Sequence, residues 1–223
     1  MQHPKRRILF TLLLLCTASS VFAQIKIGAL GGLNSTNLFG DTPKDAKYQG
    51  KIGIYSGLYF DFYVHKNVAI SVQTAFSQEG AKLLYNVPGA PQLVDSGTVN
   101  FQYIRIPVLA KINANNNRFY ALAGFDFGIL NSASFKLNNQ PDEDIHESLS
   151  KNDLSFQTGI GYRWYLKNLV LFLEGRYTIG LENLTHEPVE DINYFPRVKN
   201  SSFKILFGLE IPLWTPNGKS ELN

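Results

Sequence analysis

Residues 203–213 read FKILFGLEIPL, and an apolar side chain stands at every second position of this stretch. The apolar positions are Phe203, Ile205, Phe207, Leu209, Ile211 and Leu213. Successive side chains of a β-strand point to opposite faces of the sheet, so the alternation predicts a strand with one wholly apolar face. Residues 52–64 repeat the pattern, and only Ser56 interrupts their apolar face.

The same alternation recurs along most of the chain and predicts eight strands. They are expected at residues 25–34, 52–64, 68–79, 99–112, 119–130, 154–164, 169–182 and 203–213. The predicted connections are short at 65–67, 113–118 and 166–168, and long at about 35–50, 80–98, 131–152 and 184–200. Long loops at one end and tight turns at the other predict an all-β, up-and-down antiparallel meander with both termini at the short-turn end.

The first 23 residues predict a secretory signal peptide, and hence Sec export. Lys5, Arg6 and Arg7 form a basic start, Ile8–Cys16 an apolar segment, and 21–23 a small-residue cleavage site. Lipoprotein processing at Cys16 is an alternative, disfavoured because the preceding residue is a leucine. The expected organisation is therefore a cleaved signal peptide at 1–23, a barrel at 24–214 and a short tail at 215–223.

Composition argues against a helical membrane protein and against a nucleic-acid-binding protein. No apolar run after residue 24 approaches the roughly 20 residues that a membrane-spanning helix needs. The formal net charge of +3 comes wholly from the predicted signal peptide, so the remaining chain is neutral and no nucleic-acid partner is expected. That remainder contains no cysteine, so its rigidity must come from a large core or a closed sheet.

The polar faces of the predicted strands distinguish a soluble barrel from one in a membrane, because a lipocalin-like barrel keeps its apolar face inside. Charged side chains and glycines share the polar faces, as suits the crowded interior of a narrow barrel. Aromatic residues near the predicted strand ends suit the girdles at a membrane surface. These are Phe62, Tyr63, Tyr103, Phe119, Tyr162, Trp164, Tyr165 and Trp214. The predicted fold is an eight-stranded antiparallel up-and-down transmembrane β-barrel.

Charged residues on the predicted inward face form a candidate lumen charge network of six bases and five acids. They are Lys26, Asp61, Glu79, Arg105, Lys111, Asp126, Arg163, Glu174, Arg176, Lys204 and Glu210. Buried charges are costly unless they are paired, and eight strands leave an interior just wide enough for side chains. Near-balance therefore favours a lumen plugged by ion pairs, with a narrow polar conduit as the alternative.

Four segments resemble the outer membrane protein beta-barrel family of small porin-family and PorT-like proteins. The segments are YIRIPVLAKI (103–112), FYALAGFDFGIL (119–130), LSFQTGIGY (154–162) and LEGRYTIGLENL (173–184). The resemblance implies an eight-stranded barrel in the outer membrane of a Gram-negative bacterium, inserted by the barrel assembly machinery; most members have no assigned activity. One departure is that nine residues follow Trp214, whereas barrel assembly signals usually end on an aromatic residue.

No catalytic, cofactor or metal site is predicted. The histidines outside the signal peptide, at 65, 146 and 186, lie in three different connections. The acidic stretch at 142–147 is read as a solvated loop, with a divalent cation site as the alternative. A hydrolase or acyltransferase would need an activated nucleophile, and no spacing links His146 or His186 to the neighbouring serines at 132, 134, 148 and 150.

The sequence therefore predicts a monomeric, non-enzymatic membrane anchor that displays four long extracellular loops. Its expected partners are outer-membrane lipid, the barrel assembly machinery and a protein bound through the loops. Three alternatives remain open, which are a PorT-like accessory role in secretion or surface assembly, a narrow small-solute channel, and an outer-membrane hydrolase or acyltransferase.

Overall fold

The computed structural model describes residues 24–42, 46–85, 94–137, 141–167, 169–184 and 197–214. The predicted signal peptide and the tail at 215–223 lie outside these described residues. Within them, no helix is long and apolar enough to cross a membrane.

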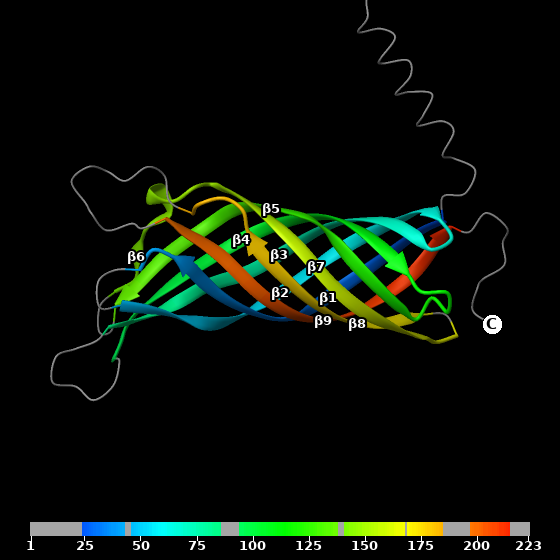
Figure 1. Cartoon of the computed structure of the whole chain (residues 1–223), viewed down its shortest axis with the longest axis horizontal. Helices are drawn as coiled ribbons and strands as arrows, with labels where there is room; N and C mark the ends of the chain where they lie inside the picture. Colours follow the sequence, from blue (N-terminus) through cyan, green and yellow to red (C-terminus); the bar gives the residue numbers. More distant parts are fainter. Residues whose placement is uncertain are drawn as a thin grey trace, which may run out of the picture.

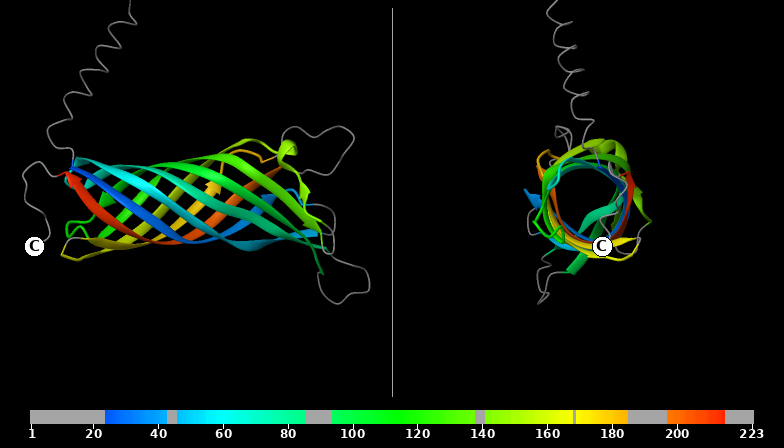
Figure 2. Two further views of the ribbon diagram at one scale, coloured as in Figure 1. Left: turned by 180° about the vertical axis from the view of Figure 1, so that it is seen from behind. Right: turned by 90° about the vertical axis from the view of Figure 1, so that its right-hand side faces the viewer.

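Eight long strands form a closed antiparallel ring (Figures 1 and 2). They are β1 (Gln24–Gly40), β2 (Ala46–His65), β3 (Val68–Tyr85), β4 (Val94–Asn113), β5 (Phe119–Leu137), β7 (Asn152–Tyr165), β8 (Val170–Gly180) and β9 (Val198–Trp214). Each strand pairs with its sequence neighbour, and the pairing of β1 with β9 closes the ring. The two-residue β6 (Glu143–Asp144) and the 3-10 helix η2 (His146–Ser148) lie between β5 and β7. The predicted eight-stranded up-and-down barrel is confirmed.

The short connections, the start of β1 and the end of β9 all lie at one end of the barrel (Figure 1). The turn between β4 and β5 is tight because Asn117 adopts a positive φ of 54°, which asparagine tolerates better than most residues. Its backbone N–H donates to the Ala114 carbonyl oxygen at 2.8 Å, and the Ala114 N–H donates to the Phe119 carbonyl oxygen at 2.8 Å. The asparagine-rich sequence thus builds the turn that the connection length predicts.

At the opposite end the strands are longer than predicted, and two of the predicted long loops are mostly strand. Pairing continues to Gly40 with Val198 and to Ala46 with Tyr85, so the predicted loops at 35–50 and 80–98 are wrong over most of their length. The apolar alternation did not extend into these segments because their outward side chains, such as Ser35 and Asn37, are polar. Backbone hydrogen bonds extend the strands where the apolar pattern has ended.

The apolar side chains face outward and the polar ones inward. On β9, Phe207 is 62% exposed, whereas Lys204 and Glu210 are 1% exposed. Two residues of the predicted aromatic girdle are corrected, because Tyr63 and Tyr103 are buried inside the barrel. Each lies two residues from a buried charge on its own strand and so shares that inward face. The side chain of Trp214 lies outside the described part of the chain.

Glycines on the inward face make room for aromatic rings on neighbouring strands. Gly28 lies directly opposite Tyr59, and a Cβ atom at Gly28 would lie 2.3 Å from the tyrosine ring. Gly208 lies opposite Phe172 in the same way, and a Cβ atom added at Gly208 would lie 2.2 Å from the Phe172 Cζ. Such contacts leave no room for a side chain at either glycine, so the interior is packed rather than open at these levels.

Candidate functional site

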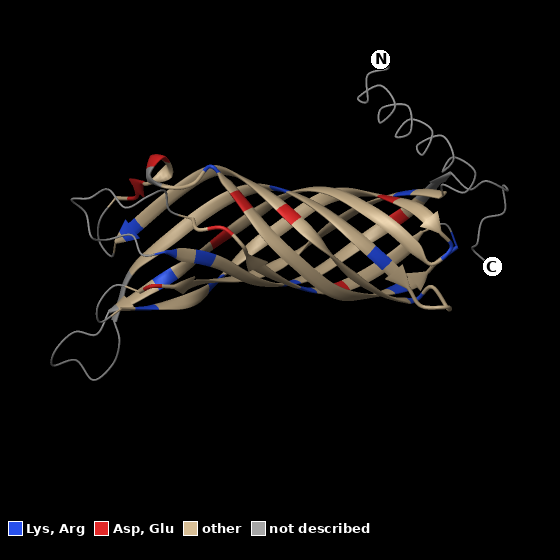
Figure 3. Cartoon of the chain, turned by 45° about the horizontal axis from the view of Figure 1, so that its top comes forward, with Lys and Arg blue, Asp and Glu red and all other residues tan. Residues whose placement is uncertain are grey.

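Twelve charged side chains are buried in the described part of the chain, six basic and six acidic. Eleven of them are the residues of the predicted lumen charge network, and the twelfth is Asp153. Charged positions of both signs are distributed along the barrel (Figure 3). Asp153 balances the six bases, so the buried charges sum to zero.

Near the short-turn end, Glu210 joins three strands. Its Oε1 lies 3.1 Å from the Lys26 Nζ, and its Oε2 accepts a hydrogen bond from the Tyr59 hydroxyl at 3.1 Å. The Arg163 Nε lies 3.7 Å from the same Oε2, and the Arg163 Nη1 donates to the Asn113 Oδ1 at 2.5 Å. This carboxylate therefore neutralises two bases that reach it from β1 and β7.

The middle of the lumen is organised around Glu174. Its Oε2 accepts from the Arg176 Nε at 2.6 Å, and its Oε1 accepts from the Tyr120 hydroxyl at 2.5 Å. The Lys111 Nζ lies 3.8 Å from the Glu174 Oε1 and donates to the Asp61 Oδ2 at 3.0 Å. Two acids and two bases from three strands, β2, β4 and β8, thus form one connected group, to which β5 adds the Tyr120 hydroxyl.

Toward the other end, Arg105 binds two carboxylates. Its Nε and Nη2 donate to the two oxygens of Glu79 at 3.0 and 2.6 Å, a bidentate geometry that fixes both side chains. Its Nη1 donates to the Asp153 Oδ2 at 2.5 Å. The neighbouring pair is looser, since the Lys204 Nζ lies 3.9 Å from the Asp126 Oδ2.

Each buried charge of the described chain lies within 3.9 Å of an opposite charge. Several of the bases also lie over the rings of inward tyrosines. The Arg163 guanidinium lies 4.1 Å from the centre of the Tyr120 ring, and the Lys111 Nζ 4.4 Å from that of Tyr59. The tyrosines add cation–π attraction to the ion pairs and occupy lumen volume.

A cluster of apolar side chains, the outer apolar cluster, lies beyond Arg105 at the end opposite the short turns. Leu149, which follows η2, is buried in it, and the Ser150 N–H donates to the Leu184 carbonyl oxygen at 2.9 Å. The connections that follow β5 and β8 therefore contribute to the cluster. Its buried members are Leu38, Ala81, Phe101, Tyr103, Leu130, Ala133, Leu149, Leu184 and Val198.

The sequence of residues 19–186 matches the outer membrane protein beta-barrel domain family. The chain belongs to this family. The predicted resemblance is confirmed, and with it the assignment of this barrel to the outer membrane. The family's outer-membrane location agrees with an apolar outer surface and a charged interior.

Solved outer-membrane barrels are similar to this family member at low sequence identity. Neisserial surface protein A is 12% identical with a TM-score of 0.47, and the match covers 84% of this chain and 96% of that one. Ail of Yersinia pestis is 16% identical with a TM-score of 0.46, covering 84% and 99%. OprG of Pseudomonas aeruginosa is 10% identical with a TM-score of 0.48, covering 86% and 97%. A search of curated proteins gave no match.

Three polar residues between β5 and β7 of this outer-membrane barrel contact the backbone or another side chain. The His146 Nε2 lies 3.3 Å from the Leu130 carbonyl oxygen, and the Ser150 hydroxyl donates to the Asn152 carbonyl oxygen at 2.8 Å. In the acidic stretch, Asp142 lies 3.2 Å from the Lys136 Nζ. Among the described residues, no group of three His, Cys, Asp or Glu side chains is placed to hold a metal ion. His186 and the side chain of Ser148 lie outside the described residues.

Sequence reasoning missed three parts of the interior. Asp153 stands one residue before the predicted start of its strand, and the inward tyrosines were not assigned to the network. The outer apolar cluster was missed because the prediction expected polar residues on the inward face. Leu38 and Phe101 are apolar residues on that face. The spacing of these two residues carried the signal, since Leu38 is two residues from the buried Thr36 and Phe101 is four residues from the buried Arg105.

Proposed function

We propose that this protein is a non-enzymatic, monomeric outer-membrane anchor with a closed lumen, and that it acts through the segments at the end opposite the short turns. These segments would face the cell exterior and bind a protein partner. In this account the short turns face the periplasm. The chain would be exported by the Sec route, with residues 1–23 as its signal peptide, and inserted by the barrel assembly machinery.

The observation that carries the proposal is the complete pairing of the buried charges. A water-filled conduit needs charged groups that stay hydrated. Here Arg105 and Glu174 are about 1% exposed, and each binds an opposite charge directly, Arg105 to Glu79 and Glu174 to Arg176. The outer apolar cluster adds a second, uncharged layer across the same lumen. Both features argue against the narrow-channel alternative.

The enzyme alternative has little support in the geometry. A serine hydrolase needs a histidine beside a nucleophile, and the His146 ring lies against a backbone carbonyl oxygen instead. The PorT-like accessory role in secretion or surface assembly remains the main rival. It uses the same exposed segments, so it differs from the anchor proposal in its partner rather than in its site.

The test is deletion of the gene with readouts of envelope permeability, secretion and adhesion, followed by complementation. One complementing chain is unmodified; the other has the connections at 86–93 and 185–196 replaced by short turns. We expect the unmodified chain to restore the lost property and the trimmed chain to insert without restoring it. Full restoration by the trimmed chain, or a defect confined to solute permeability, would contradict the proposal.

A further inference from the structure

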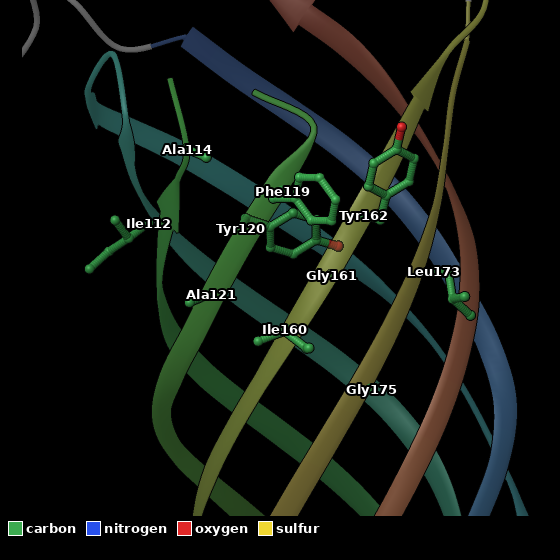
Figure 4. A pocket seen from close by; sticks show the side chains of 10 residues that line it. All are labelled: Ile112, Ala114, Phe119, Tyr120, Ala121, Ile160, Gly161, Tyr162, Leu173 and Gly175. Carbon is green, nitrogen blue, oxygen red and sulfur yellow. The ribbon is translucent and has the colours of Figure 1, made fainter. Parts of the chain in front are cut away.

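The outer surface of the barrel carries an apolar groove near the short-turn end, across β4, β5, β7 and β8 (Figure 4). Its volume is about 550 Å³, within the range of roughly 300 to 1,000 Å³ of small-molecule sites. Ile112, Phe119 and Ile160 line it and are exposed on the outward face. The groove therefore opens toward lipid and not toward the lumen.

Gly175 lines the groove from β8. The flanking Glu174 and Arg176 point into the lumen, so position 175 faces outward between its cross-strand partners Ile160 and Ile205. A Cβ atom added at Gly175 would meet no heavy atom within 4 Å. A side chain at this position would therefore start out into the open space of the groove.

Aromatic rings and one cation border the groove toward the short turns. The ring of Tyr162 lies edge-to-face with Phe119 at 4.7 Å and with Trp164 at 4.8 Å. Amphipathic aromatic side chains lie at the headgroup level of a bilayer. Arg118 of the β4–β5 turn donates from its Nη1 to the Tyr162 hydroxyl at 3.4 Å. An exposed guanidinium thus stands at the polar end of an apolar groove.

We propose that this groove binds one phospholipid of the bilayer leaflet at the short-turn end. An acyl chain lies against Ile160 and Gly175, and the phosphate binds Arg118. Charge complementarity selects this occupant, because a phospholipid places an anionic phosphate at the end of an apolar chain, in the same order as the groove and its cation. Guanidinium and phosphate form charge-assisted hydrogen bonds. None of the buried lumen charges lines the groove, so the site is independent of the proposed function.

The test measures quenching of Trp164 fluorescence by brominated lipids in phosphatidylcholine bilayers. The protein is the refolded chain 24–223 with Trp214→Phe, which leaves Trp164 as its one tryptophan. Brominated phosphatidylglycerol is compared with brominated diacylglycerol, which lacks the phosphate. We expect phosphatidylglycerol to associate more strongly by a factor of about 1.5 to 5, the range of an exposed ion pair.

Three variants locate the site. Arg118→Gln should make the two brominated lipids equal, and Gly175→Leu should lower the association of phosphatidylglycerol by the same factor because leucine occupies the groove. Ala29→Leu is the matched control, since Ala29 is the sixth residue of β1 as Gly175 is of β8, and it should change nothing.

Equal association of both lipids with the unmodified protein, or an unchanged preference in Gly175→Leu, would overturn the proposal. A second copy of the chain is the competing occupant. Efficient disulfide cross-linking of Ile160→Cys in bilayers, with none at the equally exposed Ile52→Cys, would show that copies pair at the groove and would also overturn it.

Discussion

The Lys26 Nζ on β1 lies 3.1 Å from the Glu210 Oε1 on β9, so an ion pair buried inside the barrel links its first and last strands. These residues are 184 positions apart in the sequence. The pair lies where the ring closes, and Glu210 also forms an ion pair with Arg163 of β7. The lumen charges therefore fix the closure of the barrel as well as filling its interior.

Glu210→Gln should destabilise the barrel strongly. The change leaves Lys26 and Arg163 buried without their shared carboxylate, at a cost of about 3 to 5 kcal/mol for an uncompensated buried charge. The measurement is the free energy of unfolding in urea, followed by heat-modifiable gel mobility. Lys26→Gln is the matched variant; it should cost less, because Glu210 keeps Arg163 and the Tyr59 hydroxyl. Equal costs would show that the two bases do not share Glu210 as described.

Phe207→Arg tests the outward face of β9. It places a charge on the lipid side near the middle of the bilayer, which should cost roughly 2 to 4 kcal/mol. Ser201→Arg is the control on the same face of the same strand, about 20 Å nearer the strand's outer end at 3.3 Å per residue; it should cost about 0 to 1 kcal/mol. Urea unfolding in bilayers measures both, and equal tolerance would contradict the orientation of the strand.

Gly208→Ala should also destabilise the barrel, although the substitution is small. The added Cβ would lie 2.2 Å from the Phe172 Cζ, and overpacking of a filled interior costs typically 1 to 3 kcal/mol. Phe172→Leu in the same chain removes the ring and should recover part of that loss. Thermal unfolding of the single and double variants measures the coupling, and additive effects would refute the contact.

Cysteine labelling tests which end of the barrel faces outward in the cell. The chain outside the predicted signal peptide has no native cysteine, so single cysteines report one site each. A cysteine at Asp142, in the connection between β5 and β7, should react with a membrane-impermeant thiol reagent on intact cells. One at Asn116, in the β4–β5 turn, should react only after the outer membrane is permeabilised. The reverse pattern would invert the proposed topology.

The alternation of residues predicted the ring of strands because lipid demands an apolar outward face at every second position. The same rule placed Glu174 and Arg176 on one face, and the structure buries both. Outward side chains need to be apolar only where they contact lipid. The strand extensions around Asn37 and Ser201 have polar outward side chains and were therefore predicted as loops. Beyond the lipid the pattern is set by backbone pairing, which leaves no periodic signal when outward side chains are polar.

Which charges pair could not be read from the sequence. Arg105 of β4 binds Asp153 of β7 across the lumen, and Arg176 of β8 binds Gln73 of β3 at 2.9 Å. Such contacts depend on strand register and on the shear of the closed ring rather than on spacing along one strand. The glycine and aromatic pairs have the same origin, since Gly208 and Phe172 meet only because their strands align.

Planar-bilayer recording of the unmodified protein and of Glu174→Gln tests the closed lumen most directly. The closed-lumen account predicts no steady channel current from either protein. It also predicts a loss of stability of about 3 to 5 kcal/mol in Glu174→Gln, because Arg176 and Lys111 lose their buried carboxylate. A steady conductance in the unmodified protein, shifted toward anion selectivity by Glu174→Gln with little loss of stability, would contradict the account and establish a water-filled conduit.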